Sequence, residues 1–137
     1  MFRLRSLRLA GTNIVDADIA FLQHLSELQS IDLSDTSLTD VGMVSLSLLS
    51  QLQEVELTGT NISDAAITFL TQFEGLRTLS LVGTDVTDNS VDTLASITTL
   101  RDLNLMTTKM TNRGVDRLRQ ILPRCEIAFV EKPKMLR

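Results

Sequence analysis

The fold is decided by the stretch Leu76-Arg77-Thr78-Leu79-Ser80-Leu81-Val82-Gly83-Thr84-Asp85-Val86-Thr87-Asp88, which is followed by a short helical pattern ending near Ile97. Its pattern, L-x-x-L-x-L-x-x-T-x-V-T-D, recurs every 24 residues without insertion or deletion. A fixed period of this length indicates a repeat protein, in which each unit buries its apolar face against its neighbours. The five copies begin at Leu4, Leu28, Leu52, Leu76 and Leu100.

The first half of each copy predicts a short strand. Apolar residues occupy its first, fourth and sixth positions, as Leu52, Val55 and Leu57 do in the third copy. The last two are separated by one residue, which is typical of a strand whose alternate side chains point inward. Because successive copies stack in phase, we expect their strands to pair in parallel, about 4.8 Å apart. A turn is expected at the eighth position, which is glycine in three copies.

Threonine occupies the ninth position of every copy. A turn buried between neighbouring units leaves backbone groups that need hydrogen-bond partners. A hydroxyl can donate to the carbonyl of one turn and accept from the amide of another. We therefore interpret the column as a structural ladder between copies rather than as a catalytic feature. Its members are Thr12, Thr36, Thr60, Thr84 and Thr108.

The second half of each copy predicts a helix. Apolar residues spaced by three, such as Ile67, Leu70 and Phe73, lie on one helical face. A helix of about ten residues is too short to be stable alone, so we expect packing to hold it. Side chains suited to a helix N-cap come before it, and acidic groups favour that end of a helix. We expect four aspartates to satisfy the free amides of their own helices: Asp16, Asp40, Asp64 and Asp88.

These patterns resemble the leucine-rich repeat family from residue 4 to about residue 129. The L-x-x-L-x-L core carries the resemblance, and threonine replaces the usual asparagine of the turn. The variant with T-x-I-T-D is similar to repeats of bacterial proteins, notably of planctomycetes, and the segment Leu122-Pro123-Arg124-Cys125-Glu126-Ile127 resembles the end of such arrays. The resemblance implies an α/β fold, a right-handed solenoid with a parallel sheet on its concave face and short helices on its convex face. It also implies a non-catalytic module or scaffold for protein–protein interaction, which binds its partner through the concave face.

We expect residues 1–137 to form a single leucine-rich repeat domain. Arg124, Ile127 and Phe129 fall at the first, fourth and sixth positions of a sixth unit, which predicts a capping strand at 124–130 before a tail at 131–137. Nothing comparable covers the first strand, so that edge of the sheet is open to pairing. Two explanations stay open: the chain is a regulatory fragment of a larger protein, or it is an assembly element that self-associates through its uncapped N-terminal coil. The full repeats are 4–27, 28–51, 52–75, 76–99 and 100–123.

Charge is unevenly distributed along the chain, whose net charge is −4. Between Leu9 and Leu100 thirteen acidic residues accompany one basic residue, Arg77, whereas both ends are basic. An acidic middle favours a protein partner with a basic surface. The basic C-terminus carries no nucleic-acid motif and no stacking aromatic residues, so no nucleic-acid partner is expected.

The sequence also bears on location. The lone Cys125 excludes an intrachain disulfide and favours a reducing compartment. No apolar run approaches the roughly 18 residues that a membrane span needs. The Arg-rich start superficially resembles a transit peptide, but Leu4, Leu7 and Leu9 keep the phase of the repeat. We therefore expect a cytoplasmic protein with no signal peptide and no membrane partner.

Outward strand positions predict rows of polar residues across the sheet. Asp32 and Glu56 are predicted neighbours on adjacent strands, with Glu54 two residues away. Like charges about 5 Å apart repel by roughly 1 kcal/mol in water, and a cluster of this kind can serve as a docking patch for a cationic partner. The alternative is an acidic face that only keeps the array soluble. The predicted partner-binding residues are Arg8, Asp32, Glu54, Glu56, Arg77, Ser80 and Asn104.

No other constellation indicates chemistry. The acids lack the spacing of a cation-binding loop, the glycines do not form a phosphate-binding loop, and Cys125 lacks a histidine partner. We therefore expect no cofactor, no metal site and no catalytic residue, and thus no enzyme. Phe21 and Phe69, at equivalent positions of alternate copies, are expected to lie half-buried beside neighbouring helices, with a lateral binding patch as the alternative.

Overall fold

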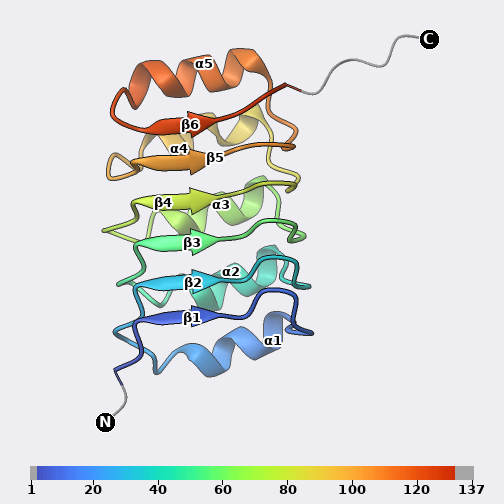
Figure 1. The fold of residues 1–137 in the computed structure, drawn as a ribbon, viewed down its shortest axis with the longest axis vertical. Coiled ribbons are helices and arrows are strands. Elements are labelled where there is room, and N and C mark those ends of the chain that lie inside the picture. Colours follow the sequence, from blue (N-terminus) through green and yellow to red (C-terminus); the bar gives the residue numbers. More distant parts are fainter. Residues whose placement is uncertain (1–2, 132–137) are drawn as a thin grey trace, which may run out of the picture.

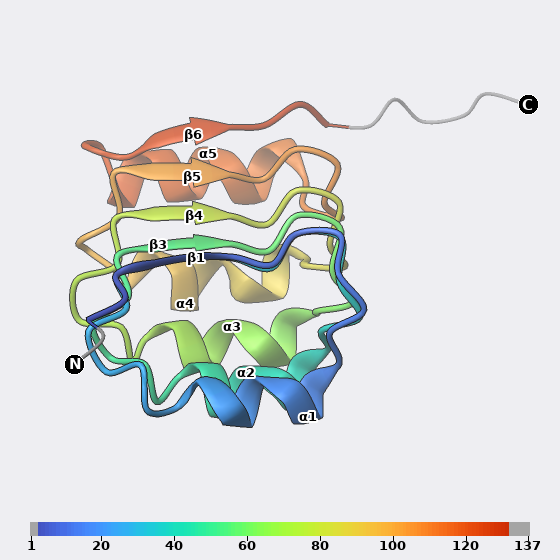
Figure 2. The same ribbon diagram turned by 60° about the horizontal axis from the view of Figure 1, so that its bottom comes forward.

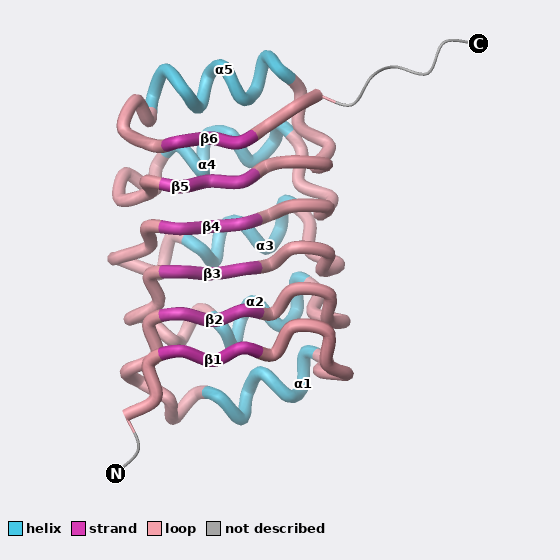
Figure 3. Tube along the Cα trace, in the orientation of Figure 1, coloured by secondary structure: helices cyan, strands magenta, loops and turns pink. Residues whose placement is uncertain are grey.

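The structure of the chain is a computed structural model that describes residues 3–131. Most of the predicted tail, from residue 132 onward, lies outside this range. Six short strands form one parallel sheet in chain order, as Figures 1 and 3 show. The sixth strand lies within residues 124–130, where the capping strand was expected, and is shorter than that range. The strands are β1 (Ser6–Arg8), β2 (Ser30–Asp32), β3 (Glu54–Glu56), β4 (Thr78–Ser80), β5 (Asp102–Asn104) and β6 (Glu126–Ala128).

Helices form a second layer behind the sheet (Figure 2). The prediction of ten-residue helices holds only for the last of them and is wrong for the others, which span four to seven residues. Their last turns tighten into bonds between residues three apart, such as Leu49 N to Leu46 O at 3.0 Å, so the chain leaves the helix early. The helices are α1 (Asp16–Ile19), α2 (Asp40–Leu46), α3 (Asp64–Leu70), α4 (Val91–Ala95) and α5 (Asn112–Ile121), with 3-10 turns η1 (Ala20–Leu22) and η2 (Asp88–Ser90).

The register of the sheet confirms the predicted rows. Arg8 pairs with Asp32, and Asp32 pairs with Glu56, so equivalent positions of successive repeats stand side by side. We call the repeats coils 1–5 and the open side of the sheet, which faces away from the helices, the strand face. The predicted turn at the eighth position is also present. Its backbone has positive φ in every coil, 68° to 70° at the glycines, 55° at Asp35 and 54° at Thr107.

The core lies between the two layers and is closed in coils 2–5, since Leu105, at the sixth position of coil 5, is 0% exposed. Leu33, Leu57 and Leu81, at the sixth position of coils 2–4, are 0% exposed. The equivalent residue of coil 1, Leu9, is only partly buried, as are Leu4, Leu7, Ile14, Leu22 and Leu25 of the same coil. Within residues 3–131 coil 1 packs against a neighbouring coil on one side only, which leaves these side chains partly exposed.

The threonine column differs from the predicted ladder. Each hydroxyl donates to a carbonyl three residues earlier in its own coil, for example Thr60 Oγ1 to Leu57 O at 2.7 Å. The geometry of the turn brings that carbonyl within reach, whereas the neighbouring coil's turn is already held by backbone bonds such as Gly59 N to Val82 O at 2.8 Å. The same bond recurs at the other four positions. The column therefore closes each turn individually and does not link the coils.

The aspartates at the start of the helices make the ladder instead. Asp64 accepts from the Thr87 amide at 2.8 Å and from the Thr87 hydroxyl at 2.6 Å, both one coil further along. Asp16, Asp40 and Asp88 make the same pair of bonds to the next coil, at 2.5 to 2.9 Å. The prediction that these carboxylates satisfy the amides of their own helices was therefore wrong.

The N-cap position itself follows the sequence prediction in part. Thr39, Thr87 and Thr111 accept with their hydroxyls from amides in the first turn of their own helices, at 3.1 to 3.3 Å. Coil 1 has valine at this position. Its Val15 amide is satisfied instead by Asp18 at 2.9 Å. The hydroxyls thus cap the helices, and the carboxylates join the coils.

Candidate functional site

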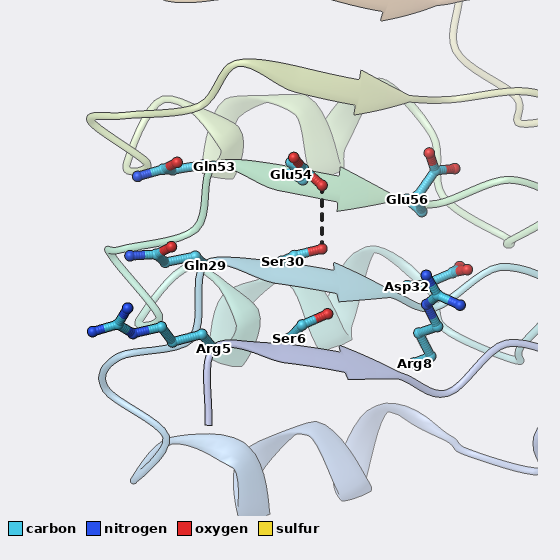
Figure 4. Close-up of a pocket in the computed structure, with 9 residues that line it drawn as sticks. All are labelled: Arg5, Ser6, Arg8, Gln29, Ser30, Asp32, Gln53, Glu54 and Glu56. Atoms are coloured by element: carbon cyan, nitrogen blue, oxygen red, sulfur yellow. Dashed lines mark hydrogen bonds between the residues drawn. The ribbon is translucent and has the colours of Figure 1, made fainter. Parts of the chain in front are cut away.

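A shallow depression on the strand face brings together the acids predicted to bind a partner. It has a volume of about 560 Å³ and opens to solvent over coils 1–3 (Figure 4). Strands β1, β2 and β3 supply its floor through their outward positions, since alternate residues of each strand point away from the core. Its lining residues are Arg5, Ser6, Arg8, Gln29, Ser30, Asp32, Gln53, Glu54 and Glu56.

The acidic residues of the depression stand close together. Asp32 and Glu56 are paired in register on neighbouring strands. Burial, the charge of Asp32 and the charge of Glu54 all raise the pKa of Glu56, against a weaker lowering by a hydrogen bond from Ser80. Within residues 3–131 no ion pair reaches any of these three carboxylates. We call Asp32, Glu54 and Glu56 the acidic cluster.

Neutral hydrogen bonds hold two of the acids in place. Asp32 accepts from the Ser34 amide at 2.9 Å, and Glu54 accepts from the Ser30 hydroxyl at 3.4 Å. Arg8 pairs in register with Asp32 and lies beside it in Figure 4, yet it makes no ion pair among the described residues. The depression therefore presents negative charge in its centre and two exposed guanidinium groups, Arg5 and Arg8, along its coil 1 side.

The other predicted residues lie outside this group. Ser80 is only 6% exposed, because its hydroxyl bonds to that of Thr58 at 2.9 Å, so it is not available to a partner. Asn104 lines a second depression of about 390 Å³ and accepts from the Met106 amide at 3.1 Å. Arg77 is exposed at the start of β4, where it lines a third depression together with Arg101.

The structure also adds residues that the sequence analysis did not name. Arg5, Gln29 and Gln53 occupy the second position of their repeats and line the same depression as the acidic cluster. The signal was present, because the second position is polar in all five copies: Arg5, Gln29, Gln53, Arg77 and Arg101. Of these five residues only Arg77 was predicted to bind a partner, because the predicted rows covered outward strand positions and left the second position out.

Two further features limit the chemistry of the described part of the chain. In residues 3–131 no three His, Cys, Asp or Glu side chains converge in the manner of metal ligands. Cys125 is buried, and burial, followed by the nearby Asp102, raises its pKa to about 11. The thiol is therefore neutral at physiological pH, whereas nucleophilic cysteines are thiolates. None of the helices between residues 3 and 131 has the length and apolar character of a membrane span.

Comparison with known proteins agrees with this architecture. Residues 2–62 match the family model described as leucine rich repeat. A search of curated proteins finds no match. Among solved structures, an internalin (InlF) of Listeria monocytogenes superposes with a TM-score of 0.77 at 23% identity, covering 95% of this chain and 36% of the internalin.

Two other structures show the same fold. A leucine-rich repeat protein of Leptospira interrogans gives a TM-score of 0.67 at 19% identity, over 92% of this chain and 37% of that one. Actin-binding site 2 of leiomodin-1 gives 0.66 at 12% identity, over 87% and 79%. The chain thus spans little more than a third of the first two proteins. The repeat, the six-stranded parallel sheet and these similarities show that the chain has the α/β solenoid fold of leucine-rich repeat proteins.

Proposed function

We propose that the protein is a non-catalytic protein-interaction module that binds a basic segment of a partner protein on its strand face. The observation that carries the proposal is the acidic cluster. Asp32 and Glu56 stand in one row of the sheet, Glu54 lies two residues from Glu56, and no ion pair among residues 3–131 reaches the three carboxylates. Repulsion between such charges is of order 1 to 4 kcal/mol, depending on solvent exposure. A partner's lysine or arginine side chains would relieve it, which gives the interaction both attraction and specificity.

The surrounding residues support a peptide-like partner rather than a small molecule. The depression is open, and its floor is formed by polar side chains of three parallel strands (Figure 4). Gln29 and Gln53 can each donate and accept hydrogen bonds, as peptide groups require. Arg5 and Arg8 would meet an acidic residue or a carboxylate of the same partner. The leiomodin-1 structure, which has the same fold, is actin-binding site 2 of that protein and so offers a precedent for protein binding.

Neutralising the acidic cluster is expected to weaken binding of a basic peptide at least tenfold. The probe is an acetylated and amidated octapeptide of alternating Lys and Ala, titrated by calorimetry or fluorescence anisotropy. The variant combines Asp32→Asn, Glu54→Gln and Glu56→Gln, because Asn at position 32 retains an acceptor for the Ser34 amide. The difference in affinity between the unmodified chain and this variant should shrink as the salt concentration rises, since exposed charges are screened within about 10 Å at 0.1 M salt.

A matched control removes the same number of charges elsewhere. It combines Glu74→Gln, Asp92→Asn and Asp116→Asn, three exposed acids that do not line the depression. Binding by this control should stay within about twofold of the unmodified chain, because distant surface charges are largely screened. Equal losses in the two variants would show that net charge alone attracts the peptide, and would overturn the proposal.

The pH dependence of this binding gives a second readout. Because the pKa of Glu56 is raised, its carboxyl takes up a proton at a higher pH than an ordinary glutamate does. Affinity for the lysine peptide should therefore begin to fall above the usual glutamate pKa of about 4.3. In the single variant Glu56→Gln the fall should move to lower pH, because the group with the raised pKa is gone. An identical profile in both proteins would contradict a role for Glu56.

A second candidate function is self-association through the uncapped N-terminal coil. It is favoured by the incomplete burial of Leu4, Leu7 and Leu9 compared with their equivalents in coils 2–4. The free edge of β1 could also add a strand.

In keeping with the expectations from the sequence, we place the protein in the cytoplasm of a bacterium, where a single buried thiol stays reduced.

A further inference from the structure

The second position of the repeat forms a row of its own, at the edge of the sheet where the strands begin. Figure 4 shows its first three members, Arg5, Gln29 and Gln53, in the same depression as the acidic cluster. Backbone bonds continue this row into coils 4 and 5, since Arg77 N donates to Gln53 O and Arg101 N donates to Arg77 O, both at 2.8 Å. Two arginines therefore stand next to each other on adjacent coils.

Arg77 and Arg101 line the third depression, which has a volume of about 340 Å³. Its other lining residues are Gln53, Gly75 and Thr99, so no carboxylate lines it. Within residues 3–131 no ion pair reaches either guanidinium group. The two backbones are one strand spacing apart, about 4.8 Å, so the like charges repel each other. An anion in the depression would relieve this repulsion.

The guanidinium group of Arg101 is oriented by the backbone. Its Nη1 atom donates to Leu100 O at 2.9 Å and to Thr98 O at 3.1 Å. A guanidinium group has five N–H donors, and no hydrogen bond between described residues uses its other two nitrogens. Asp102 follows Arg101 in the chain but lines the second depression, and no ion pair joins the two. Arg101 thus keeps donors for a ligand.

A glycine keeps the third depression open. Gly75 occupies the last position of coil 3, and the equivalent residues of coils 1, 2 and 4 have side chains: Glu27, Gln51 and Thr99. The backbone does not require glycine here, because Gly75 is not among the glycines with positive φ. A Cβ atom at this position would meet only Gln53 Cγ, at an ordinary 3.7 Å. The missing side chain is therefore no requirement of the fold and leaves room beside the arginines.

The chemistry of the third depression favours a carboxylate from a partner that also contacts the acidic cluster. Guanidinium groups bind carboxylates through two parallel hydrogen bonds. With strands about 4.8 Å apart and a rise of about 3.3 Å per residue, the backbones of Glu54 and Glu56 lie roughly 6–14 Å from those of the two arginines. An extended peptide covers that distance with about two to four residues. One short segment can therefore reach both places.

We propose that Arg77 and Arg101 bind a carboxylate side chain of the same partner segment whose lysine or arginine residues lie on the acidic cluster. This inference rests on the proposed function and narrows the partner. Its segment carries basic residues and, about three residues away, an aspartate or glutamate. The strand face is acidic over coils 2 and 3 and has paired arginines over coils 4 and 5, so matching both charges also fixes the register of the segment.

Calorimetric titration with two matched peptides tests the proposal. Both are acetylated and amidated, with the one-letter sequences AEAAKAKAAEA and AQAAKAKAAQA, whose symmetry allows either direction of binding. The glutamate preference is the affinity for the first peptide divided by the affinity for the second. It should fall at least threefold when Arg77→Gln and Arg101→Gln are combined, because a carboxylate loses its guanidinium partners. The second glutamate can still meet Arg5 and Arg8, so some preference remains.

A second variant probes the third depression without removing an arginine. Gly75→Glu places a carboxylate beside Arg77 and Arg101, where it competes with the peptide, so the glutamate preference should again fall at least threefold. This variant decides the question even if the loss of the Arg101 backbone bonds unfolds the chain. The matched control combines Lys109→Gln and Arg113→Gln, two exposed cations that do not line the depression. Its glutamate preference should stay within about 1.5-fold of that of the unmodified chain.

Three results would overturn the proposal. A glutamate preference that is unchanged in Gly75→Glu, or in a folded double arginine variant, would show that the third depression does not meet the peptide. An equal fall in the control would attribute the preference to net charge. A preference that appears only with phosphoserine in place of glutamate would assign the depression to a phosphorylated partner. Failure of the proposed function is distinct, because the chain with a neutralised acidic cluster would then bind both peptides as tightly as the unmodified chain.

Discussion

Replacing Asp64 by alanine is expected to lower the free energy of unfolding by about 3 kcal/mol, because hydrogen bonds to charged groups contribute roughly 1.5–3 kcal/mol each and are not fully additive. Asp64 accepts from the amide and the hydroxyl of Thr87 and from the hydroxyl of Ser90, at 2.6 to 2.8 Å. All three donors belong to the next coil. Their loss would weaken the contact between coils 3 and 4 at the point where the helices begin.

Urea denaturation followed by circular dichroism measures this effect. The control is Asp85→Ala, which removes an exposed ion pair to Lys109 and should cost less than about 1 kcal/mol. The loss in the free energy of unfolding for Asp64→Asn should lie between those of the two alanine variants. Its amide oxygen still accepts a hydrogen bond, whereas its amino group cannot. If Asp64→Ala were no more harmful than Asp85→Ala, the carboxylates would not be the bonds that join the coils.

Asp64 also makes the stability of the fold depend on pH. Burial opposes the ionised form of Asp64, but the hydrogen bonds from Ser90 and Thr87 outweigh it and lower the pKa below the ordinary value of 3.8. A lowered pKa in the folded state means that the stabilisation is complete above the unfolded pKa and is lost as pH falls through the folded one. The stability difference between the unmodified chain and Asp64→Ala should therefore be constant near neutrality and shrink below about pH 4.

Replacing Leu57 by alanine is expected to destabilise the protein by about 3 kcal/mol or more, as buried leucines in well-packed cores do. Leu57 is 0% exposed and lies in coil 3, with a complete coil on either side. The equivalent substitution in coil 1, Leu9→Ala, should cost about half as much, because the side chain is only partly buried and leaves a smaller cavity.

Chemical denaturation of the two variants under identical conditions makes this comparison. The same amino acid is replaced at the same position of the repeat. The difference between the two losses in the free energy of unfolding therefore reports how deeply each leucine is buried. Equal losses would mean that Leu9 is covered as completely as Leu57. In that case another copy of the chain would cover coil 1 in solution, as the second candidate function requires.

Much of the fold could be predicted from the 24-residue period. An unbroken repeat fixes which residues stand side by side, so the pairing of Asp32 with Glu56 followed from counting alone. The sixth strand followed in the same way from Ile127, whose partner in register is Leu103. These predictions rested on the spacing of apolar residues, which is a direct consequence of strand geometry.

Bonds between side chains were harder to predict. Both the aspartates and the N-cap hydroxyls were noted in the sequence, but the bond from Asp64 to Thr87 depends on the distance between coils and on the orientation of both side chains. Ser80 was predicted to face solvent because it alternates with buried residues, yet the neighbouring Thr58 covers it. Such local coverage is a property of three-dimensional packing and has no period in the sequence.

The exposure of Phe21 was missed for a related reason. Phe69 is partly buried against the core, but Phe21 is 74% exposed, so the expectation that Phe21 is half-buried was wrong. An aromatic residue is expected to be buried, and the pattern does not say that the inward positions of coil 1 are already filled by Ile19 and its neighbours.

The account depends on one claim, that parallel strands in strict register place the acidic cluster on one face. Nuclear Overhauser contacts in the isotope-labelled chain test it directly. The account predicts amide-to-alpha contacts typical of parallel strands around the pairs Ser30–Glu54 and Asp32–Glu56, each 24 residues apart. A register shifted by one residue would put Asp32 and Glu56 on different faces, and alpha-to-alpha contacts would show antiparallel strands, in which these residues are not paired. Either result would contradict the account.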